Sequence, residues 1–148
     1  MTVKFDILQE DDRWNNLPIQ AITDQVSAVM IFPDRASEVS VLLTNDAGIQ
    51  NLNNTYRHKD KTTNVLAFPS CDPAGMLLGD IAMSYDVMQI EAEERGIPLR
   101  FHYAHLLTHG LLHLMGYDHI QDDDAQKMEA KEEEILRQLD IPSPYSAE

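Results

Sequence analysis

The chain has little cysteine, no long apolar run and few basic residues. Its 148 residues include one cysteine, Cys71, so no disulfide can form within the chain, which fits a reducing compartment. No stretch approaches the roughly 18 consecutive apolar residues that a membrane-spanning helix requires. Residues 1–6 lack the basic segment and apolar run of a secretory signal peptide. We therefore expect a cytoplasmic protein that does not engage a membrane.

Basic residues are outnumbered, with 11 Lys and Arg against 25 Asp and Glu, for a formal charge of −14. This charge argues against tight, nonspecific binding to a polyanion, but a nucleic-acid enzyme with local positive charge stays open. Three of the 11 basic residues lie within residues 57–61, whereas seven of the 25 acidic residues lie between residues 122 and 134. The distribution of charge is therefore more informative than its total.

Hydrophobic periodicity predicts one α/β domain over residues 1–148, without repeats or a linker. Four strands are predicted at residues 3–8, 38–44, 64–68 and 76–84. Five helices are predicted. The first starts at about Pro18 and the second at Asn45 or Asp46, and the other three cover residues 85–95, 98–115 and 122–139. Because the third and fourth strands are joined directly, they should form a hairpin in a mixed four-stranded sheet of the α+β type. The long helix 98–115 should pack centrally on this sheet.

Two segments are expected to lie outside these elements. Residues 11–16 are polar and predict a loop, with Trp14 packed over the edge of the core. Residues 141–148 are expected to form a frayed tail.

The most informative segment is residues 108–119, which places histidines at positions 109, 113 and 119. On a helix, His109 and His113 share a face because they are four residues apart. Gly116 can end the helix in a left-handed conformation, so that the chain turns back and brings His119 to the same point. Three imidazoles around an open fourth position are typical of a catalytic zinc site. We therefore predict one metal ion, Zn²⁺ by preference, although nickel, copper or iron also suit three histidines.

The spacing of these histidines is also that of the metzincin peptidases, in which a glutamate follows the first histidine as general base. Gly110 occupies that position here. Glycine can neither accept nor donate a proton, so the ligand geometry is retained while the peptidase base is missing. A metallopeptidase is therefore an alternative that the spacing favours and Gly110 opposes.

Other polar residues each allow two interpretations. Arg57, within the basic segment, could hold a phosphate, but from composition alone a solvated turn is the simpler interpretation. His105, one turn before His109, could orient a metal ligand or touch substrate, or it could be a hydrogen-bonded core histidine. His102 is expected to be peripheral. Asp118 could contact a ligand histidine or simply occupy the turn.

The chain resembles the YbeY family of bacterial endoribonucleases, which are also called rRNA maturation factors. The family motif His-Gly-x-Leu-His-Leu-x-Gly-Tyr-Asp-His stands at residues 109–119, with further matching blocks at residues 54–61, 65–69 and 78–81 and at His102 and His105. These blocks lie between residues 54 and 119, a span of about half of the chain, in the family's order. Thr62 and Ala67 depart from the family pattern, which often has proline and serine there, but neither position could contribute a reactive group.

The resemblance implies a zinc-dependent endoribonuclease that cleaves single-stranded RNA. It further implies work on ribosomal RNA, notably the 3′ end of the small-subunit RNA, and in ribosome quality control, with ribosomal or assembly proteins as further partners. By residue match, the three histidines of the motif hold the metal, and the family's key arginine falls on Arg57, which reverses the interpretation from composition alone. We expect Lys59 and Lys61 to guide the RNA backbone nearby.

The nucleophile and one further alternative stay open. Without a carboxylate directly after His109, cleavage would depend on an activated water, which hydrolyses the phosphodiester, or on attack by the RNA 2′-hydroxyl. A third interpretation is a non-catalytic ribosome-assembly factor whose metal only stabilises the fold.

Overall fold

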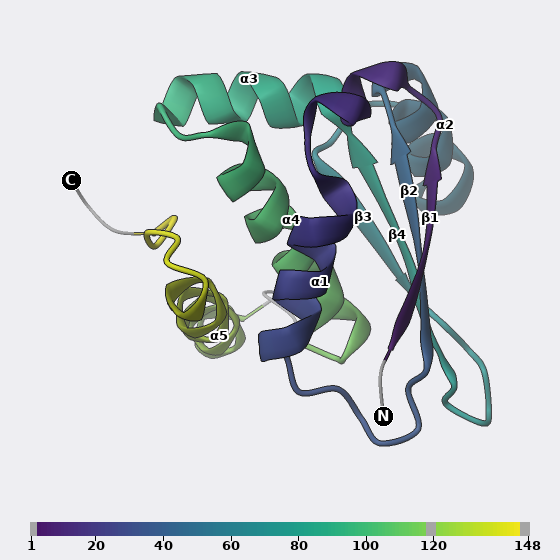
Figure 1. Cartoon of the computed structure of the whole chain (residues 1–148). Helices are drawn as coiled ribbons and strands as arrows, with labels where there is room; N and C mark the ends of the chain where they lie inside the picture. Colours follow the sequence, from purple (N-terminus) through teal and green to yellow (C-terminus); the bar gives the residue numbers. More distant parts are fainter. Residues whose placement is uncertain (1–2, 118–120, 146–148) are drawn as a thin grey trace.

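The computed structural model describes residues 3–117 and 121–145, and within them the chain forms one four-stranded sheet and five α-helices (Figure 1). The strands are β1 (Lys4–Gln9), β2 (Glu38–Thr44), β3 (Val65–Pro69) and β4 (Leu77–Ser84). The α-helices are α1 (Ile19–Val29), α2 (Asp46–Arg57), α3 (Tyr85–Arg95), α4 (Leu99–Leu114) and α5 (Asp122–Gln138). The predicted fold class, the mixed sheet and the five helices are confirmed.

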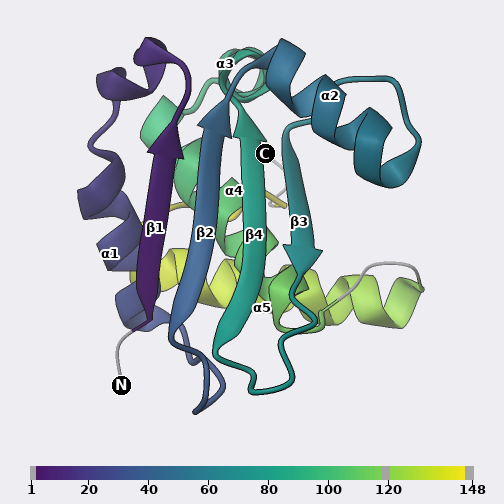
Figure 2. The ribbon, with the colours of Figure 1, turned by 90° about the vertical axis from the view of Figure 1, so that its right-hand side faces the viewer.

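The sheet has the order β1-β2-β4-β3, with two parallel pairs and one antiparallel pair (Figure 2). β1 and β4 each run parallel to β2, whereas β3 pairs with β4 as the predicted hairpin. Figure 2 shows α2 over the β3 side of one sheet face, with α1, α4 and α5 behind the other face. Because β3 lies at the edge, groups from α2 and from α4 can meet beside it.

α4 is buried on nearly every side and is central to the core, as predicted. Its residues Tyr103, Leu107 and Leu111 are fully buried, and it packs against β3, β4, α1, α3 and α5. Gly110 lets this helix approach the sheet closely, because a Cβ there would lie 3.1 Å from Cδ1 of Ile81. Neither α4 nor any other helix within the two described ranges combines the length and hydropathy of a membrane span.

The loop predicted for residues 11–16 was wrong, because Asp12–Asn16 forms a 3₁₀ helix. Trp14 does not lie at the edge of the core but is fully buried. Its indole Nε1 donates a 2.9 Å hydrogen bond to the carbonyl of Thr44 at the end of β2, and its ring packs edge-on against Tyr85 and Tyr103. A buried indole needs a partner for its N–H. Because the partner of Trp14 lies on a strand that is distant in the sequence, the pattern of neighbouring residues does not reveal it.

The prediction of a frayed tail was wrong for residues 141–145. Ile141 packs against the core, and its N–H donates to the carbonyl of Leu136 at 2.9 Å. The hydroxyl of Tyr145 donates to Glu132 at 2.9 Å. Residues 141–145 therefore pack against the rest of the protein next to α5.

Candidate metal centre

A cavity of about 670 Å³ opens beside β3, where α2, β3 and α4 come together. Its lining includes Arg57, Asn64, Val65, Ala67, His109, Gly110, His113 and Tyr117. The fold thus brings Arg57, at the end of α2, to the same cavity as His109 and His113 on α4. The sequence separation between these residues gives no hint of this proximity.

The imidazoles of His109 and His113 converge across one turn of α4. Their Nε2 atoms lie 3.1 Å apart, and their ring centroids lie 4.6 Å apart. Two imidazole nitrogens bound to one tetrahedral zinc ion are separated by about 3.3 Å, because the Zn–N distance is about 2.0–2.1 Å. The arrangement of His109 and His113 therefore fits two ligands of one metal ion.

The third predicted ligand, His119, and its neighbour Asp118 lie outside the described residues, so their roles stay predictions. Within residues 3–117 and 121–145, no group of three or more His, Cys, Asp or Glu side chains is arranged to hold a metal ion. Gly116, which follows the C-cap residue Met115 of α4, has a φ of 101°, as predicted for the residue that turns the chain. The described geometry thus covers two of the three predicted ligands and the turn that follows them.

Glu132 of α5 is a component of this region that the sequence analysis missed. Its side chain is fully buried, and its Oε1 lies 3.1 Å from Nδ1 of His109 and 3.0 Å from Nε2 of His105. Burial by itself raises the pKa of this carboxyl, but hydrogen bonds from His105 and His109 outweigh burial and lower the pKa to about 2. The one available signal was a glutamate at an inward position of an amphipathic helix, between Met128 and Ile135.

An ionised Glu132 fixes the protonation pattern of the two histidines that contact it. A carboxylate can only accept hydrogen bonds, so Nδ1 of His109 and Nε2 of His105 are the donors. In a neutral imidazole, the lone pair of His109 is then on Nε2, which faces His113. This is the tautomer that a metal-binding histidine needs, and carboxylates commonly impose it in metal sites.

The two histidines before His109 are both buried. His105 is 8% exposed and is linked to His109 through Glu132, so it is both a core histidine and part of the hydrogen-bond network behind the site. The prediction that His102 is peripheral was wrong, because α3 packs on α4 there and Nε2 of His102 lies 2.8 Å from Glu91. Burial lowers the pKa of His102, although the hydrogen bond with Glu91 opposes this shift.

Arg57 is held by two contacts with β3. Its Nη2 donates to the carbonyl of Ala67 at 2.8 Å, and its guanidinium lies 5.3 Å from the ring centroid of Phe68. Helix α2 ends here because His58 adopts a left-handed conformation, with φ of 58°. A guanidinium has five N–H donors, so these contacts orient the group and leave it able to bind a ligand.

Lys59 and Lys61 are exposed and are not part of the described cavity lining. The segment that carries them is held through its main chain, since the side-chain amide of Asn53 donates to the carbonyl of Lys61 at 3.1 Å. Their expected contact with RNA therefore stays a prediction for the surface outside the cavity.

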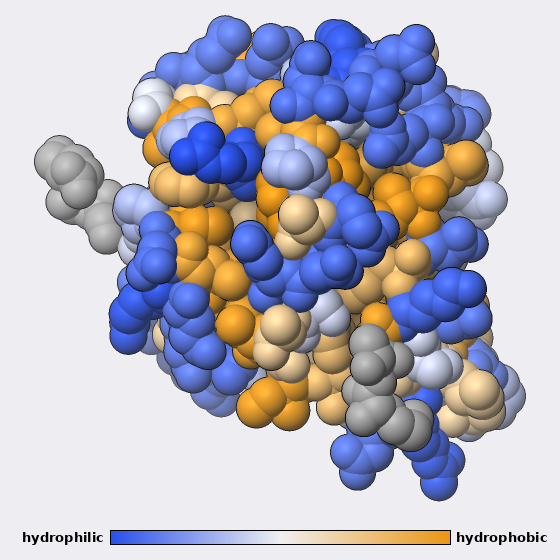
Figure 3. Space-filling view, in the orientation of Figure 1, coloured by the Kyte–Doolittle hydropathy of each residue, from blue (hydrophilic) through white to orange (hydrophobic). Residues whose placement is uncertain are grey.

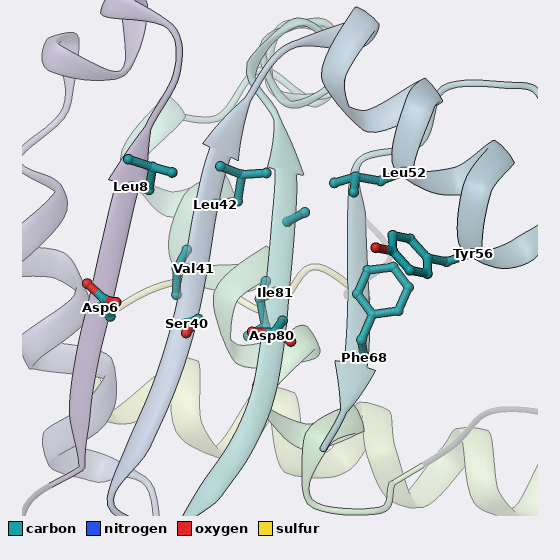
Figure 4. Close-up of a pocket in the computed structure, with 11 residues that line it drawn as sticks. Asp6, Leu8, Ser40, Val41, Leu42, Leu52, Tyr56, Phe68, Asp80 and Ile81 are labelled. Carbon is teal, nitrogen blue, oxygen red and sulfur yellow. The ribbon is translucent and has the colours of Figure 1, made fainter. Parts of the chain in front are cut away.

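A second cavity, of about 500 Å³, lies on the sheet face opposite to α4 (Figure 4). Asp6, Ser40 and Asp80 stand side by side across three strands there, and Leu8 and Leu42 lie above them. Two carboxylates repel a phosphate, so this surface is unsuited to bind an RNA backbone. The cavity beside β3 is the better candidate for the functional site.

Comparisons with known proteins agree with the sequence motifs. Residues 5–140 match the family model described as Endoribonuclease YbeY. A protein named Endoribonuclease YbeY from Bradyrhizobium diazoefficiens is 51% identical over 118 residues, and the match covers 74% of this chain and 64% of that protein. A protein of the same name from Rhodopseudomonas palustris is 46% identical over 130 residues, with 82% of this chain and 77% of that protein covered.

A solved structure shows the same fold. The solution structure of a protein from Thermotoga maritima has a TM-score of 0.55 and 23% sequence identity, over 97% of this chain and 100% of that chain. The fold and the cavity beside β3 define a single-domain α/β protein whose central helix presents histidines to an edge of the sheet. The chain belongs to the YbeY endoribonuclease family.

Proposed function

We propose that this chain is a metal-dependent endoribonuclease that hydrolyses phosphodiester bonds in single-stranded RNA in the cytoplasm. We further propose zinc as its metal and ribosomal RNA as its substrate, notably near the 3′ end of the small-subunit RNA, in ribosome maturation and quality control. Family membership supports the reaction class, since both relatives are named Endoribonuclease YbeY. The observation on which the proposal depends is the meeting of Arg57 with His109 and His113 in one cavity.

The proposed metal ligands are His109, His113 and His119. The donor set fits zinc, because the Nε2 atoms of the first two histidines converge and Glu132 holds His109 in the tautomer of a ligand. When bound, a zinc ion supplies Lewis-acid activation of a water molecule and of a phosphate oxygen.

The proposed role of Arg57 is to bind the phosphate that is cleaved. Its hydrogen bond to Ala67 and its contact with Phe68 orient the guanidinium before RNA arrives. Charge-assisted hydrogen bonds from arginine to phosphate become stronger as negative charge develops on the phosphate oxygens. Arg57 would therefore stabilise the transition state more than the bound RNA.

The packing of Gly110 disfavours the metallopeptidase alternative. A Cβ at this position would lie 3.1–3.3 Å from three carbon atoms of Ile81, which is 1% exposed. A glutamate directly after His109 would require the side chain of Ile81 to give way by a few tenths of an ångström. The close packing of α4 on β4 thus opposes the base that the peptidases use.

The proposal is tested by measuring metal content and cleavage together. Purified protein should contain about one zinc ion per chain, and it should cleave labelled single-stranded RNA but neither the matching duplex nor casein. The variant His113→Ala should lose both zinc and RNA cleavage. Casein cleavage would favour a metallopeptidase. Ribosome association with zinc bound, but without cleavage of any RNA, would favour the non-catalytic assembly factor.

A further inference from the structure

Residues 141–145, which we call the C-terminal tail here, and α5 meet at the carboxylate of Glu132, behind the cavity. Tyr145 is 41% exposed, yet its hydroxyl donates a 2.9 Å hydrogen bond to Oε2 of Glu132. The same hydroxyl lies 3.4 Å from Nε2 of His105. Figure 3 shows apolar residues gathered between α3 and α5 on this face of the molecule. A cavity of about 580 Å³ lies there, and Phe101, Ile141 and Pro144 are part of its lining.

We propose that Glu132 is a positioning residue for His109, and that Tyr145 and His105 hold Glu132 in the orientation that this requires. The C-terminal tail would thereby set how tightly the site holds its metal ion. This inference rests on the proposed function, because it assigns His109 to a metal site.

The hydrogen bonds of Glu132 divide between its two oxygens. Oε1 accepts from both His105 and His109, at 3.0 and 3.1 Å, and Oε2 accepts from Tyr145 at 2.9 Å. A carboxylate held at one oxygen can still rotate about its last side-chain bond. Donors at both oxygens fix the plane of the carboxylate, and with it the direction in which Oε1 faces Nδ1 of His109.

The orientation of Glu132 matters because it controls one ring atom of His109. When Nδ1 of His109 donates to Oε1, its Nε2 keeps the lone pair and faces the cavity shared with His113. Loss of the tyrosine hydroxyl would leave Oε2 buried without this donor, and the carboxylate would turn to find another partner. The population of the correct His109 tautomer would then fall, and metal affinity would fall with it.

A purely structural role for Glu132 makes a different prediction. In that case the network would only join α4, α5 and the tail. Its loss would lower the melting temperature of the metal-free protein and leave zinc affinity and the His109 tautomer unchanged. Zinc affinity and the His109 tautomer therefore distinguish a positioning role of Glu132 from a purely structural one.

The experiment compares Tyr145→Phe and Glu132→Gln with the wild-type protein. Glu134→Gln is the matched control, because it removes one negative charge from an exposed position of the same helix. Zinc affinity is measured by competition with a chromogenic chelator, and the His109 tautomer by ¹⁵N NMR of the metal-free protein. We expect zinc affinity to fall about 10-fold in Tyr145→Phe and about 100-fold in Glu132→Gln, with less than about a twofold change in the control. Glu132→Gln should also show a mixture of His109 tautomers.

Two outcomes would overturn the inference in distinguishable ways. If the wild-type protein binds zinc and cleaves RNA while both variants keep its zinc affinity and tautomer, the positioning role is wrong and the proposed function stands. If the wild-type protein binds no zinc, the proposed function fails and the inference fails with it. If Glu132→Gln does not fold, Tyr145→Phe still decides, because it removes a single oxygen from a partly exposed side chain.

Discussion

Nη2 of Arg57 donates a 2.8 Å hydrogen bond to the carbonyl oxygen of Ala67, which joins the end of α2 to the edge strand β3. Ala67 also lines the cavity that His109 and His113 reach from α4. β3 therefore stands between the two helices and determines where the guanidinium lies relative to the imidazoles. The proposed site depends on this strand as much as on the side chains that would act on RNA.

Replacement of Arg57 by lysine should lower turnover without loss of metal. Lysine keeps the positive charge but lacks the planar fork that binds two phosphate oxygens. We expect kcat for single-stranded RNA to fall about 100-fold, with zinc content unchanged. The control Lys59→Ala, at an exposed position, should change kcat less than about threefold and act mainly on KM at low salt. Equal losses of zinc and turnover in Arg57→Lys would show that Arg57 is structural.

Removal of the metal should lower the thermal stability of the protein. A ligand present at 100 times its Kd stabilises the folded state by about 2.7 kcal/mol, which corresponds to roughly 5–10 °C in Tm for a chain of this size. Differential scanning fluorimetry before and after chelation, and after zinc is restored, measures this shift. The Tm of the His113→Ala variant should change little when zinc is removed or restored. An equal zinc-induced shift in that variant would mean that zinc binds elsewhere.

Gly79 and Gly96 both have positive φ values but should respond differently to alanine. Gly96, with φ of 64°, has nothing within 4 Å of an added Cβ, so its replacement should cost only about 1–2 kcal/mol for the left-handed conformation. At Gly79, with φ of 154°, the Cβ would lie 2.5 Å from the carbonyl oxygen of Phe68. Gly79→Ala should therefore cost more than about 3 kcal/mol in the free energy of unfolding measured with urea. Equal costs would mean that β3 can move away from β4.

Arg13 links two carboxylates and should make stability depend on pH. It donates to Asp86 at 2.7 Å and to Asp11 at 2.9 Å, and these hydrogen bonds hold the pKa of both carboxyls below their usual range. Because the folded pKa values lie below the unfolded ones, the network stabilises the protein above about pH 4 and loses this effect as the pH falls.

Arg13→Gln should consequently lower the urea midpoint at pH 7, and its difference from the wild type should shrink as the pH falls towards 3. Arg35→Gln removes the same charge from an exposed turn. Its urea midpoint should differ little from that of the wild type, and this difference should not change with pH. A difference for Arg13→Gln that stays constant between pH 7 and 3 would show that the ion pairs contribute nothing.

Local sequence was sufficient for the strands and the α-helices, although not for the 3₁₀ helix Asp12–Asn16, and for part of the site. The helix and strand periods place the sheet strands and all five helices close to their observed bounds, because each period is a property of neighbouring residues. The spacing of His109 and His113 likewise implies that they share a face, and their Nε2 atoms do meet. Trp14 and His102 were misplaced, because the groups that bury them, on β2 and α3, are distant in the sequence.

By itself, then, the sequence determined the strands and α-helices, the mixed sheet and the helix that presents the histidines. The tertiary structure alone decided that Arg57 shares a cavity with His109, and that the carboxylate behind His109 is Glu132. The reason is that both relationships join separate elements across the core. Their distances are set by how α2, β3, α4 and α5 pack, which no spacing along one segment encodes.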